Sequence, residues 1–223
     1  NNEVIAMSSD TKAVAPGKDV NGNKTVNNCS SDNGKPVPTI LELAKAAGKS
    51  VGAVTTTELT HATPAATYAH ICHRDAAYDI AAQAVPGGAG YNSALKDGVD
   101  VLMGGGANHW TPYSASNKGG RNDNRDLTAE MKAQGYSYVT TQSELAKVTS
   151  GKVLGLFSSK SHLDYELDRV AKGAANTQPS LSEMTAKAID LLSKNSQGYF
   201  LMVEGGRIDH ALHGTNAKRS LTD

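Results

Sequence analysis

The sequence predicts an α/β domain with a mostly parallel sheet and helices on both faces. Short runs of small, apolar and β-branched residues, typical of buried strands, lie at 51–57, 99–103, 152–157 and 199–203. Segments with helical spacing alternate with them, and this alternation favours parallel strands joined by helices. With 223 residues and 39% hydrophobic residues, the chain can bury the core of one layered domain.

Turn-forming residues and helix-end residues define the first predicted elements. Residues 1–33 are rich in Asn, Ser, Asp, Gly and Lys, and we predict a surface loop there, outside the core. A short helix is predicted from Pro38, with apolar residues at helical spacing and Gly48 at its end. The strand at 51–57 follows directly.

The later elements follow the same order. The strand at 99–103 ends in three glycines, and the segment 108–126, full of Asn, Gly, Ser and Arg, is predicted to be an excursion at the edge of the sheet. A further buried strand is expected at 152–157. The capping box at 180–183 opens an amphipathic helix through Leu192, which leads to the last strand. No interdomain linker is visible.

Charge and hydropathy exclude two classes of partner. Lys plus Arg and Asp plus Glu both number 22, so no basic field attracts nucleic acid or anionic lipid. No stretch approaches the roughly 20 apolar residues of a membrane-spanning helix, and the first ten residues lack the pattern of a signal peptide. Because the first residue is Asn and not Met, we expect a processed precursor or a chain that begins inside a longer protein.

Cys29 and Cys72 are the two cysteines of the chain. They are too few for a disulfide scaffold and lack the C-x-x-C spacing of a zinc or redox site. From the residues alone, a disulfide and two free thiols both remain open, because geometry decides between them.

Metal-ligand side chains gather just after the strand that ends at Val203. If a helix begins near Ile208, Asp209 and His213 lie four residues apart on one face. A carboxylate and an imidazole on one face supply half of a four-ligand zinc site. Glu204, on the other side of a Gly-Gly turn, is placed to serve a second metal. The alternative is an ordinary charged loop capped by Asp209.

A second segment of interest follows the strand at 51–57. Thr63 and Pro64 by themselves indicate an N-cap with Pro in the first helical turn. Arg74 would then lie about three turns along the same helix from Thr63, roughly 16 Å by axial rise. A lone Arg is usually a surface charge, but near metals its planar guanidinium can bind two oxygens of a phosphate.

These segments resemble the alkaline phosphatase family. Residues 51–66, with His70 and Arg74 after them, look like the metal and phosphate segment of the bacterial enzymes, and residues 203–213 resemble the second metal segment. The resemblance covers most of the chain from Pro38 onward, and further blocks in the family's order lie at 100–106, 154–157 and 188–195.

The resemblance implies a three-layer α/β sandwich, of which residues 1–223 would form part of a single catalytic domain. The family hydrolyses phosphate monoesters with two zinc ions and one magnesium ion through a phosphoserine. By its pattern Asp209 and His213 would bind zinc, while Thr63 and Glu204 would bind magnesium through oxygen, the donor that magnesium prefers.

The family pattern also assigns the phosphate contacts. Arg74 would clamp the phosphate oxygens of a substrate or of inorganic phosphate. Two further positions vary among family members, and both are His here. His61 would lie near the magnesium site, and His210 would contact the phosphate directly or from just outside its first contacts.

Location and assembly are further implications of the resemblance. The family is usually exported and dimeric, so we expect a periplasmic or secreted protein and a homodimer. Export, with no third cysteine to compete, predicts that Cys29 and Cys72 form a disulfide. It would close a loop of about 40 residues.

Several parts of the family pattern have no match in this sequence. The chain contains no Asp-Ser-Ala or Asp-Ser-Gly motif for the nucleophilic serine, and the family's first-strand Asp, its later Asp-His pair and its last His are also unmatched. We therefore expect an internal piece of the enzyme that is inactive alone. One alternative is a non-catalytic secreted metal-binding module. The other is a related sulfatase or phosphodiesterase, and the Thr63-Pro64 block and the block from Glu204 to His213 together argue against that one.

Overall fold

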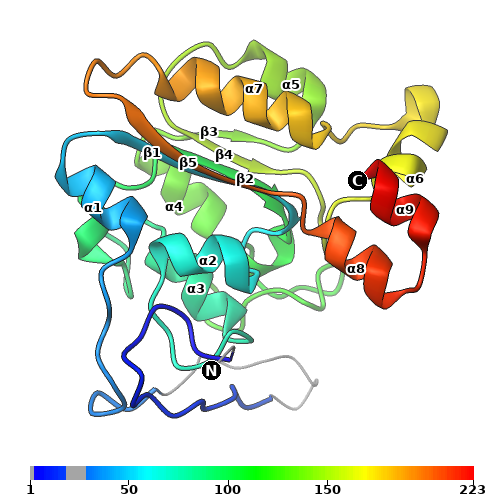
Figure 1. Ribbon diagram of the computed structural model, residues 1–223. Helices are drawn as coiled ribbons and strands as arrows, with labels where there is room; N and C mark the ends of the chain where they lie inside the picture. Colours follow the sequence, from blue (N-terminus) through cyan, green and yellow to red (C-terminus); the bar gives the residue numbers. More distant parts are fainter. Residues whose placement is uncertain (1–2, 19–28) are drawn as a thin grey trace.

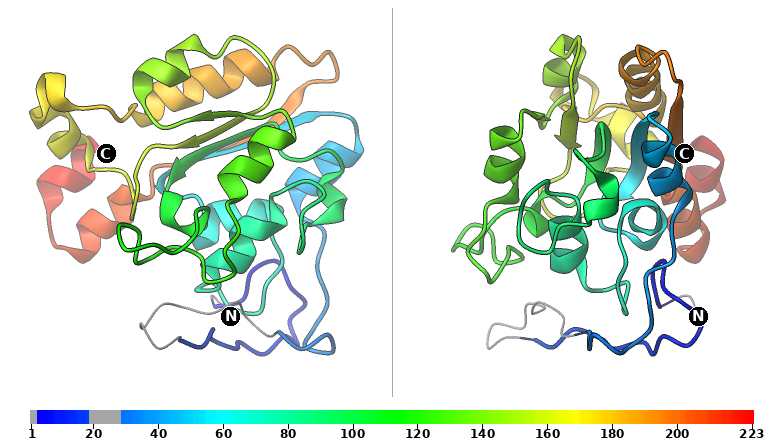
Figure 2. Two further views of the ribbon diagram at one scale, coloured as in Figure 1. Left: turned by 180° about the vertical axis from the view of Figure 1, so that it is seen from behind. Right: turned by 90° about the vertical axis from the view of Figure 1, so that its left-hand side faces the viewer.

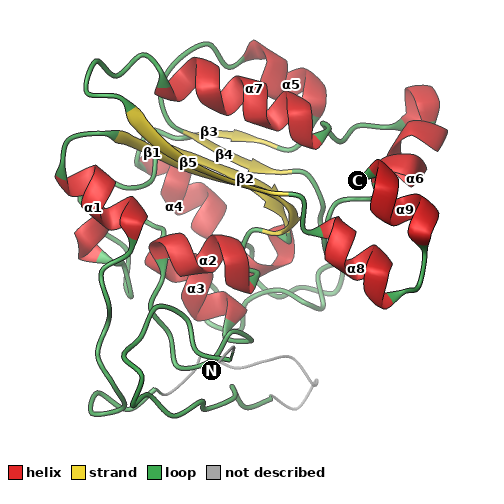
Figure 3. Ribbon diagram, in the orientation of Figure 1, coloured by secondary structure: helices red, strands yellow, loops and turns green. Residues whose placement is uncertain are grey.

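Within the described residues, five parallel strands form a single sheet in the order β3-β4-β2-β1-β5 (Figures 1 and 3). The computed structural model describes residues 3–18 and 29–223. All neighbouring strands of the sheet run parallel, which confirms the predicted fold class. The strands are β1 (Ser50–Glu58), β2 (Val101–Gly105), β3 (Ser137–Val139), β4 (Val153–Leu156) and β5 (Tyr199–Glu204).

Helices cover both faces of the sheet and make three layers (Figures 1 and 2). One face carries α1 (Ile40–Ala46), α2 (Ala62–Tyr68), α3 (Ala77–Gln83) and α4 (Leu127–Ala133), and the other carries α5 (Gln142–Lys147) and α7 (Leu181–Leu192). Beyond the carboxyl ends of the strands lie α6 (Glu166–Ala171), α8 (Arg207–His213) and α9 (Ala217–Thr222). Short 3-10 turns occur at Ser93–Leu95, Ala107–His109 and Gly173–Ala175.

Two apolar cores flank the sheet, because successive side chains of a strand point to opposite faces. In β2, Leu102 packs into the core beneath α1–α4, while Val101 and Met103 pack into the core beneath α5 and α7. All five residues of β2 are buried, as expected for a middle strand of a parallel sheet. Burial on both faces explains why these strands read as continuous apolar runs.

Except for the helix predicted from Thr63 to Arg74, the boundaries of the predicted helices and strands agree with the structure to within a few residues. The predicted capping box is present at α7, where Ser180 Oγ accepts from the Glu183 N–H at 3.2 Å. A second one opens α1, with Thr39 as N-cap and Glu42 at the third helical position. Each box satisfies donors that the first helical turn leaves without partners.

The predicted helix from Thr63 to Arg74 is wrong. The helix α2 begins at Ala62, with His61 as N-cap, and ends at Tyr68. The chain then leaves in an extended conformation because tertiary partners satisfy its backbone: the His70 N–H donates to Gln83 Oε1, and Gln83 Nε2 donates to the His70 carbonyl, both at 2.8 Å. Arg74 therefore lies in a turn.

The opening segment contributes to the core, contrary to the predicted surface loop at 1–33. Ile5 is only 3% exposed and packs in the core beneath α1–α4. It exchanges two backbone hydrogen bonds with Ile71, at 3.0 and 3.1 Å. Residues 1–2 and 19–28 lie outside the described part of the chain, so the prediction is not tested there.

The excursion at 108–126 leaves the middle of the sheet and not its edge. It follows β2, which lies between β4 and β1, and it returns through α4. Two large side chains anchor it, because Trp110 and Arg121 are buried, and Arg121 Nη1 donates to the carbonyls of Tyr78 at 2.6 Å and His109 at 3.1 Å.

The predicted disulfide is present. Cys29 and Cys72 are bonded, with their Cα atoms 5.9 Å apart, and they lie 43 positions apart in sequence. The bond attaches the opening segment to the chain just after α2.

A buried contact between a carboxylate and an imidazole joins the same regions. The Glu42 carboxylate accepts from the Thr39 N–H at 2.8 Å and from Asn92 Nδ2 at 2.6 Å, and its Oε1 lies 2.6 Å from His70 Nε2. The other ring nitrogen of His70 lies 2.8 Å from the Ala6 carbonyl oxygen. Burial favours a raised pKa for Glu42, but the hydrogen bonds from Asn92, Thr39 and His70 outweigh it, so the Glu42 pKa is lowered.

We predict that replacing both cysteines (Cys29→Ser with Cys72→Ser) lowers the free energy of unfolding by about 4 kcal/mol, because the unfolded chain regains the entropy of a closed loop. Urea denaturation measures the loss. Reducing the unmodified chain should produce the same shift, and an unchanged urea midpoint in the variant would contradict the prediction.

We predict that Glu42→Gln destabilises the fold by about 1.5–3 kcal/mol above pH 5, because hydrogen bonds to a buried charge are lost. The pKa of Glu42 is lower in the folded state than in the unfolded chain. Its contribution to the free energy of unfolding is therefore complete above the ordinary pKa of 4.5 and is lost as the pH falls through the pKa that Glu42 has in the folded state.

Unfolding free energies measured from pH 7 to pH 3 should therefore converge for the two proteins at low pH. Glu144→Gln is the matched control, because Glu144 holds the same capping position in α5 but is exposed. Equal losses for the two variants would count against the buried contact.

Candidate functional site

The two motif segments meet at the carboxyl ends of neighbouring strands (Figure 1). The register of β1 and β5 places Thr55 opposite Glu204, and α8 begins three residues after Glu204. On the other side of β1, Glu58 is opposite Gly105 of β2. The residues after the predicted strands therefore share one end of the sheet, where ligands bind in such folds.

An irregularity in β1 positions Glu204. The pairing of β1 with β2 shifts between Val54 and Glu58, and within this bulge the Thr57 N–H donates to Thr55 Oγ1 at 2.9 Å. Thr55 Oγ1 in turn donates to Glu204 Oε2 at 2.6 Å, and Thr57 Oγ1 lies 3.3 Å from the same oxygen. The two threonines thus hold the carboxylate at the end of the sheet.

Asp209 and His213 lie on one face of α8, as predicted. Asp209 Oδ1 and His213 Nε2 are 3.6 Å apart, and their side chains are 69% and 80% exposed. Two ligands of one tetrahedral zinc ion, each about 2.1 Å from it, are about 3.4 Å apart. The pair therefore fits a shared ion without rearrangement.

The predicted magnesium residues come from two elements. Thr63 is exposed in the first turn of α2, and Glu204 is half-buried at the end of β5. His61, the N-cap of α2, has a buried Nδ1 with no hydrogen-bond partner. Thr63 and Glu204 offer oxygen donors of the type that magnesium prefers, and His61 Nδ1 is a buried polar atom without a partner. Within residues 3–18 and 29–223, however, no group of three or more His, Cys, Asp or Glu residues is arranged to hold a metal.

Arg74 reaches this region despite the early end of α2. Arg74 Nη2 lies 3.5 Å from His61 Nε2, and the Arg74 N–H donates to the Glu3 carbonyl at 2.6 Å. Burial lowers the pKa of His61, as do the charges of Arg74 and His210, and the carboxylates of Glu204 and Asp209 only partly offset them. At neutral pH His61 is therefore an uncharged neighbour of the guanidinium.

Three imidazole rings form a cluster at the centre of the site. The His61 ring meets those of His162 and His210 edge-on, with centroids 5.6 Å away in both cases, and the centroids of His162 and His210 are 4.3 Å apart. Burial lowers the pKa of His162 to about 3, with the charges of His210 and Arg207 adding to the effect. His210 also has a lowered pKa, through burial and then Arg207.

His162 is the site residue that the sequence interpretation missed. It follows the predicted strand at 152–157 and so lies beyond the same end of the sheet. That position, and the residue type, were the signals available in the sequence.

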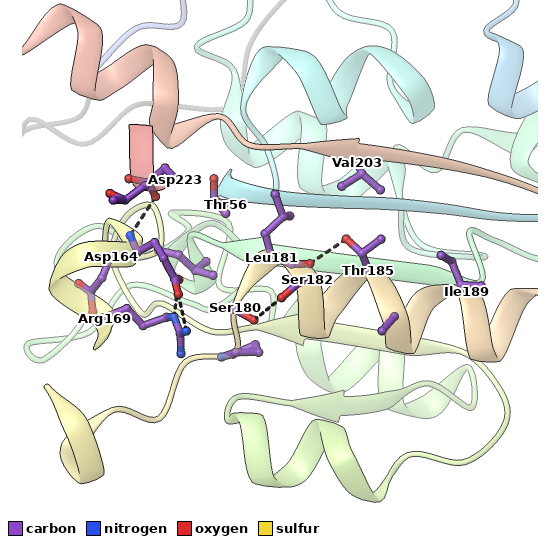
Figure 4. A pocket seen from close by; sticks show the side chains of 15 residues that line it. Thr56, Asp164, Arg169, Ser180, Leu181, Ser182, Thr185, Ile189, Val203 and Asp223 are labelled. Atoms are coloured by element: carbon purple, nitrogen blue, oxygen red, sulfur yellow. Dashed lines mark hydrogen bonds and ion pairs between the residues drawn. The ribbon is translucent and has the colours of Figure 1, made fainter. Parts of the chain in front are cut away.

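A pocket of about 610 Å³ adjoins the cluster but does not contain it. Figure 4 shows Leu181, Thr185 and Ile189 of α7, with its N-cap Ser180, on one side of the pocket and Asp223 and Thr56 on another. None of the predicted site residues is among the described residues that line the pocket. Thr56 links the two places, because its hydroxyl accepts from the Arg207 N–H at 3.2 Å.

Comparison with known proteins agrees with the sequence resemblance. A family model described as alkaline phosphatase matches residues 1–223. The chain belongs to the alkaline phosphatase family.

Named relatives include both bacterial and animal alkaline phosphatases. Alkaline phosphatase 4 of Bacillus subtilis is 41% identical over 210 residues, covering 91% of this chain and 40% of the relative. The tissue-nonspecific alkaline phosphatase of Gallus gallus is 40% identical over 225 residues, covering 91% of this chain and 42% of the relative. The chain thus spans about two fifths of the length of these curated alkaline phosphatases.

Solved alkaline phosphatase structures share the fold. The Thermus thermophilus enzyme superposes with a TM-score of 0.72 at 36% identity, covering 99% of this chain and 44% of that one. The enzyme of the Antarctic bacterium TAB5 gives a TM-score of 0.65 at 26% identity, covering 99% of this chain and 60% of that one.

We predict that Thr55→Val lowers the unfolding free energy of this alkaline phosphatase chain by about 1–3 kcal/mol, because the buried Thr57 N–H and Glu204 both lose a partner. Thr57→Val is the matched control, since the Thr57 hydroxyl accepts from no backbone N–H among the described contacts. Urea denaturation compares the two, and a larger loss for Thr57→Val would contradict this account of the bulge.

Proposed function

We propose that the chain forms part of a metal-dependent phosphate monoester hydrolase that acts through a phosphoserine. The observation that carries the proposal is the meeting of two distant segments: Arg74 and His61 lie beside the end of β5, where Glu204 and then α8 follow. The carboxylates of Glu204 and Asp209 act electrostatically on His61, as does the Arg74 charge. Two carboxylates that can bind cations and a guanidinium that can bind an anion therefore lie around His61.

The proposed metal ligands follow from the donor atoms. Asp209 and His213 would hold zinc, and Glu204 and Thr63 would hold magnesium with His61 beside it; the proposed full set is two zinc ions and one magnesium. A variant of the TAB5 enzyme, with His replaced by Asp, has been solved with magnesium bound. Such ions activate an attacking oxygen and stabilise a leaving oxygen in phosphoryl transfer.

Arg74 supplies the phosphate contact. Its guanidinium can donate two parallel hydrogen bonds to a phosphate and so orient it. The Glu3 carbonyl, which accepts from the Arg74 N–H, fixes the turn that carries this side chain. His61 and His210, uncharged at alkaline pH, would contact the phosphate or its neighbouring solvent without adding positive charge.

Location and assembly complete the proposal. The Cys29–Cys72 disulfide favours an oxidising compartment, so we place the protein in the periplasm or outside the cell. We further propose that the enzyme is a homodimer. Within the described residues, no helix has the length and apolar character needed to span a bilayer.

A non-catalytic metal-binding module is the second candidate. It is favoured by the exposure of Asp209 and His213, which leaves this pair accessible to a metal ion from solvent. The family match leaves the sulfatase and phosphodiesterase alternatives without support.

A chimera distinguishes the two candidates. In it, this chain replaces the matching segment of Bacillus subtilis alkaline phosphatase 4, which then supplies the remaining segments. We predict that the chimera hydrolyses p-nitrophenyl phosphate at alkaline pH, that a chelator abolishes this, and that the chain alone shows no turnover.

In the chimera, Arg74→Ala should weaken inhibition by phosphate at least about tenfold without loss of zinc, because an Arg side chain has no lone pair for a metal. Arg74→Lys, which keeps the charge but not the paired donors, is the matched control. A well-folded, zinc-loaded chimera without turnover would support the binding module instead.

A further inference from the structure

The main chain around His162 is fixed on both sides. The Gly106 N–H donates to the Ser161 carbonyl at 2.8 Å, and the Leu163 N–H donates to the Thr56 carbonyl at 2.9 Å. These bonds attach the loop to the ends of β2 and β1. His162 is therefore held by the sheet itself, although it lies in a loop.

Close packing at Gly105 brings the loop within reach of β1. A Cβ at Gly105 would lie 2.3 Å from the Ser161 carbonyl oxygen, so only glycine permits this approach. At this distance the Glu58 N–H donates to His162 Nδ1 at 3.0 Å. Since Nδ1 accepts a hydrogen bond, the proton of the neutral ring is on Nε2.

Arg207 imposes the same tautomer on His210. Arg207 Nη1 lies 3.0 Å from His210 Nδ1, and because a guanidinium is always protonated, it is the donor. The Arg207 guanidinium is itself stacked over the Tyr165 ring, 3.7 Å from its centroid. The neutral His210 ring consequently also carries its proton on Nε2.

His162 and His210 thus offer two neighbouring Nε2–H donors beside His61. Their centroids are 4.3 Å apart, both rings are half-buried, and both contact His61, whose Nε2 is 3.5 Å from Arg74 Nη2. The Nδ1 atoms face the scaffold, so the Nε2–H groups point away from it. A protonated Nε2 has no lone pair for a metal but can donate to an oxyanion.

We propose that His162 is an oxyanion-binding residue that donates its Nε2–H, paired with that of His210, to oxygens of the phosphate group held by Arg74. This inference rests on the proposed phosphatase function and adds a residue to it. Two neutral donors orient a phosphate dianion while leaving the charge balance to Arg74 and the metals. The Glu58 N–H and Arg207 act as positioning groups that fix both rings.

Nuclear magnetic resonance of the chain labelled with ¹⁵N-histidine tests the first step. At pH 8.5, well above the ordinary His pKa of about 6.5, long-range ¹H–¹⁵N spectra report the tautomer of each ring. We expect protonated Nε2 in both His162 and His210, and displacement of both Nε2 signals on addition of inorganic phosphate. A protonated Nδ1 in His162, or a His162 signal indifferent to phosphate, would overturn the proposal.

Substitutions in the chimera test the second step. His162→Leu should raise the KM for p-nitrophenyl phosphate and the phosphate inhibition constant about tenfold, with a smaller effect on kcat. His162→Gln, whose amide N–H occupies nearly the position of Nε2–H, should restore both to within about threefold. Equal losses in the two variants would indicate a structural role and refute the proposal.

The outcomes separate this inference from the proposed function. An active chimera that is insensitive to His162→Leu refutes the role of His162 and leaves the phosphatase function intact. An inactive chimera, with phosphate still displacing the His162 and His210 signals in the chain, refutes the phosphatase function and retains the oxyanion site.

Discussion

The parallel pairing of β1 with β5 is the constraint on which the candidate site depends. It places Thr55 opposite Glu204 and starts α8 beside the end of β1, so that segments about 150 residues apart share one surface. At the bulge between Thr55 and Thr57, the Thr57 backbone N–H bonds to the Thr55 hydroxyl instead of to a neighbouring strand, and that hydroxyl donates to Glu204. A regular strand would satisfy its own N–H groups and leave Glu204 to water.

The sequence was informative where local chemistry decides the structure. Parallel strands buried on both faces must be apolar, which made β1, β2 and β4 visible in the sequence. The edge strand β5 is only partly buried but is also mostly apolar, whereas the three-residue edge strand β3 begins with exposed Ser137 and gave no signal. The Asp209 and His213 pair followed from helical periodicity alone. The donor types of this pair indicated half of a zinc site, and the family resemblance assigned Thr63 and Glu204 to magnesium and Arg74 to phosphate. All of these roles stay predictions.

Tertiary contacts decided what the sequence did not predict. The helix before Arg74 ends at Tyr68 because Gln83, from another helix, binds the backbone of His70. The position of His162 depends on how closely a loop passes Gly105, a distance that no local pattern encodes. Ile5 is buried because it pairs with Ile71, although the overall composition of residues 1–33 indicates a surface loop.

The disulfide has a consequence for the order in which the molecule is completed. Cys72 lies two residues before Arg74, and Glu3, on the tethered opening segment, accepts from the Arg74 backbone. In a nascent chain with reduced thiols, only non-covalent contacts would hold this segment against the turn. Disulfide formation would therefore be the step that covalently fixes the surroundings of the Arg74 guanidinium, and under the proposed export it would follow departure from the reducing compartment of synthesis.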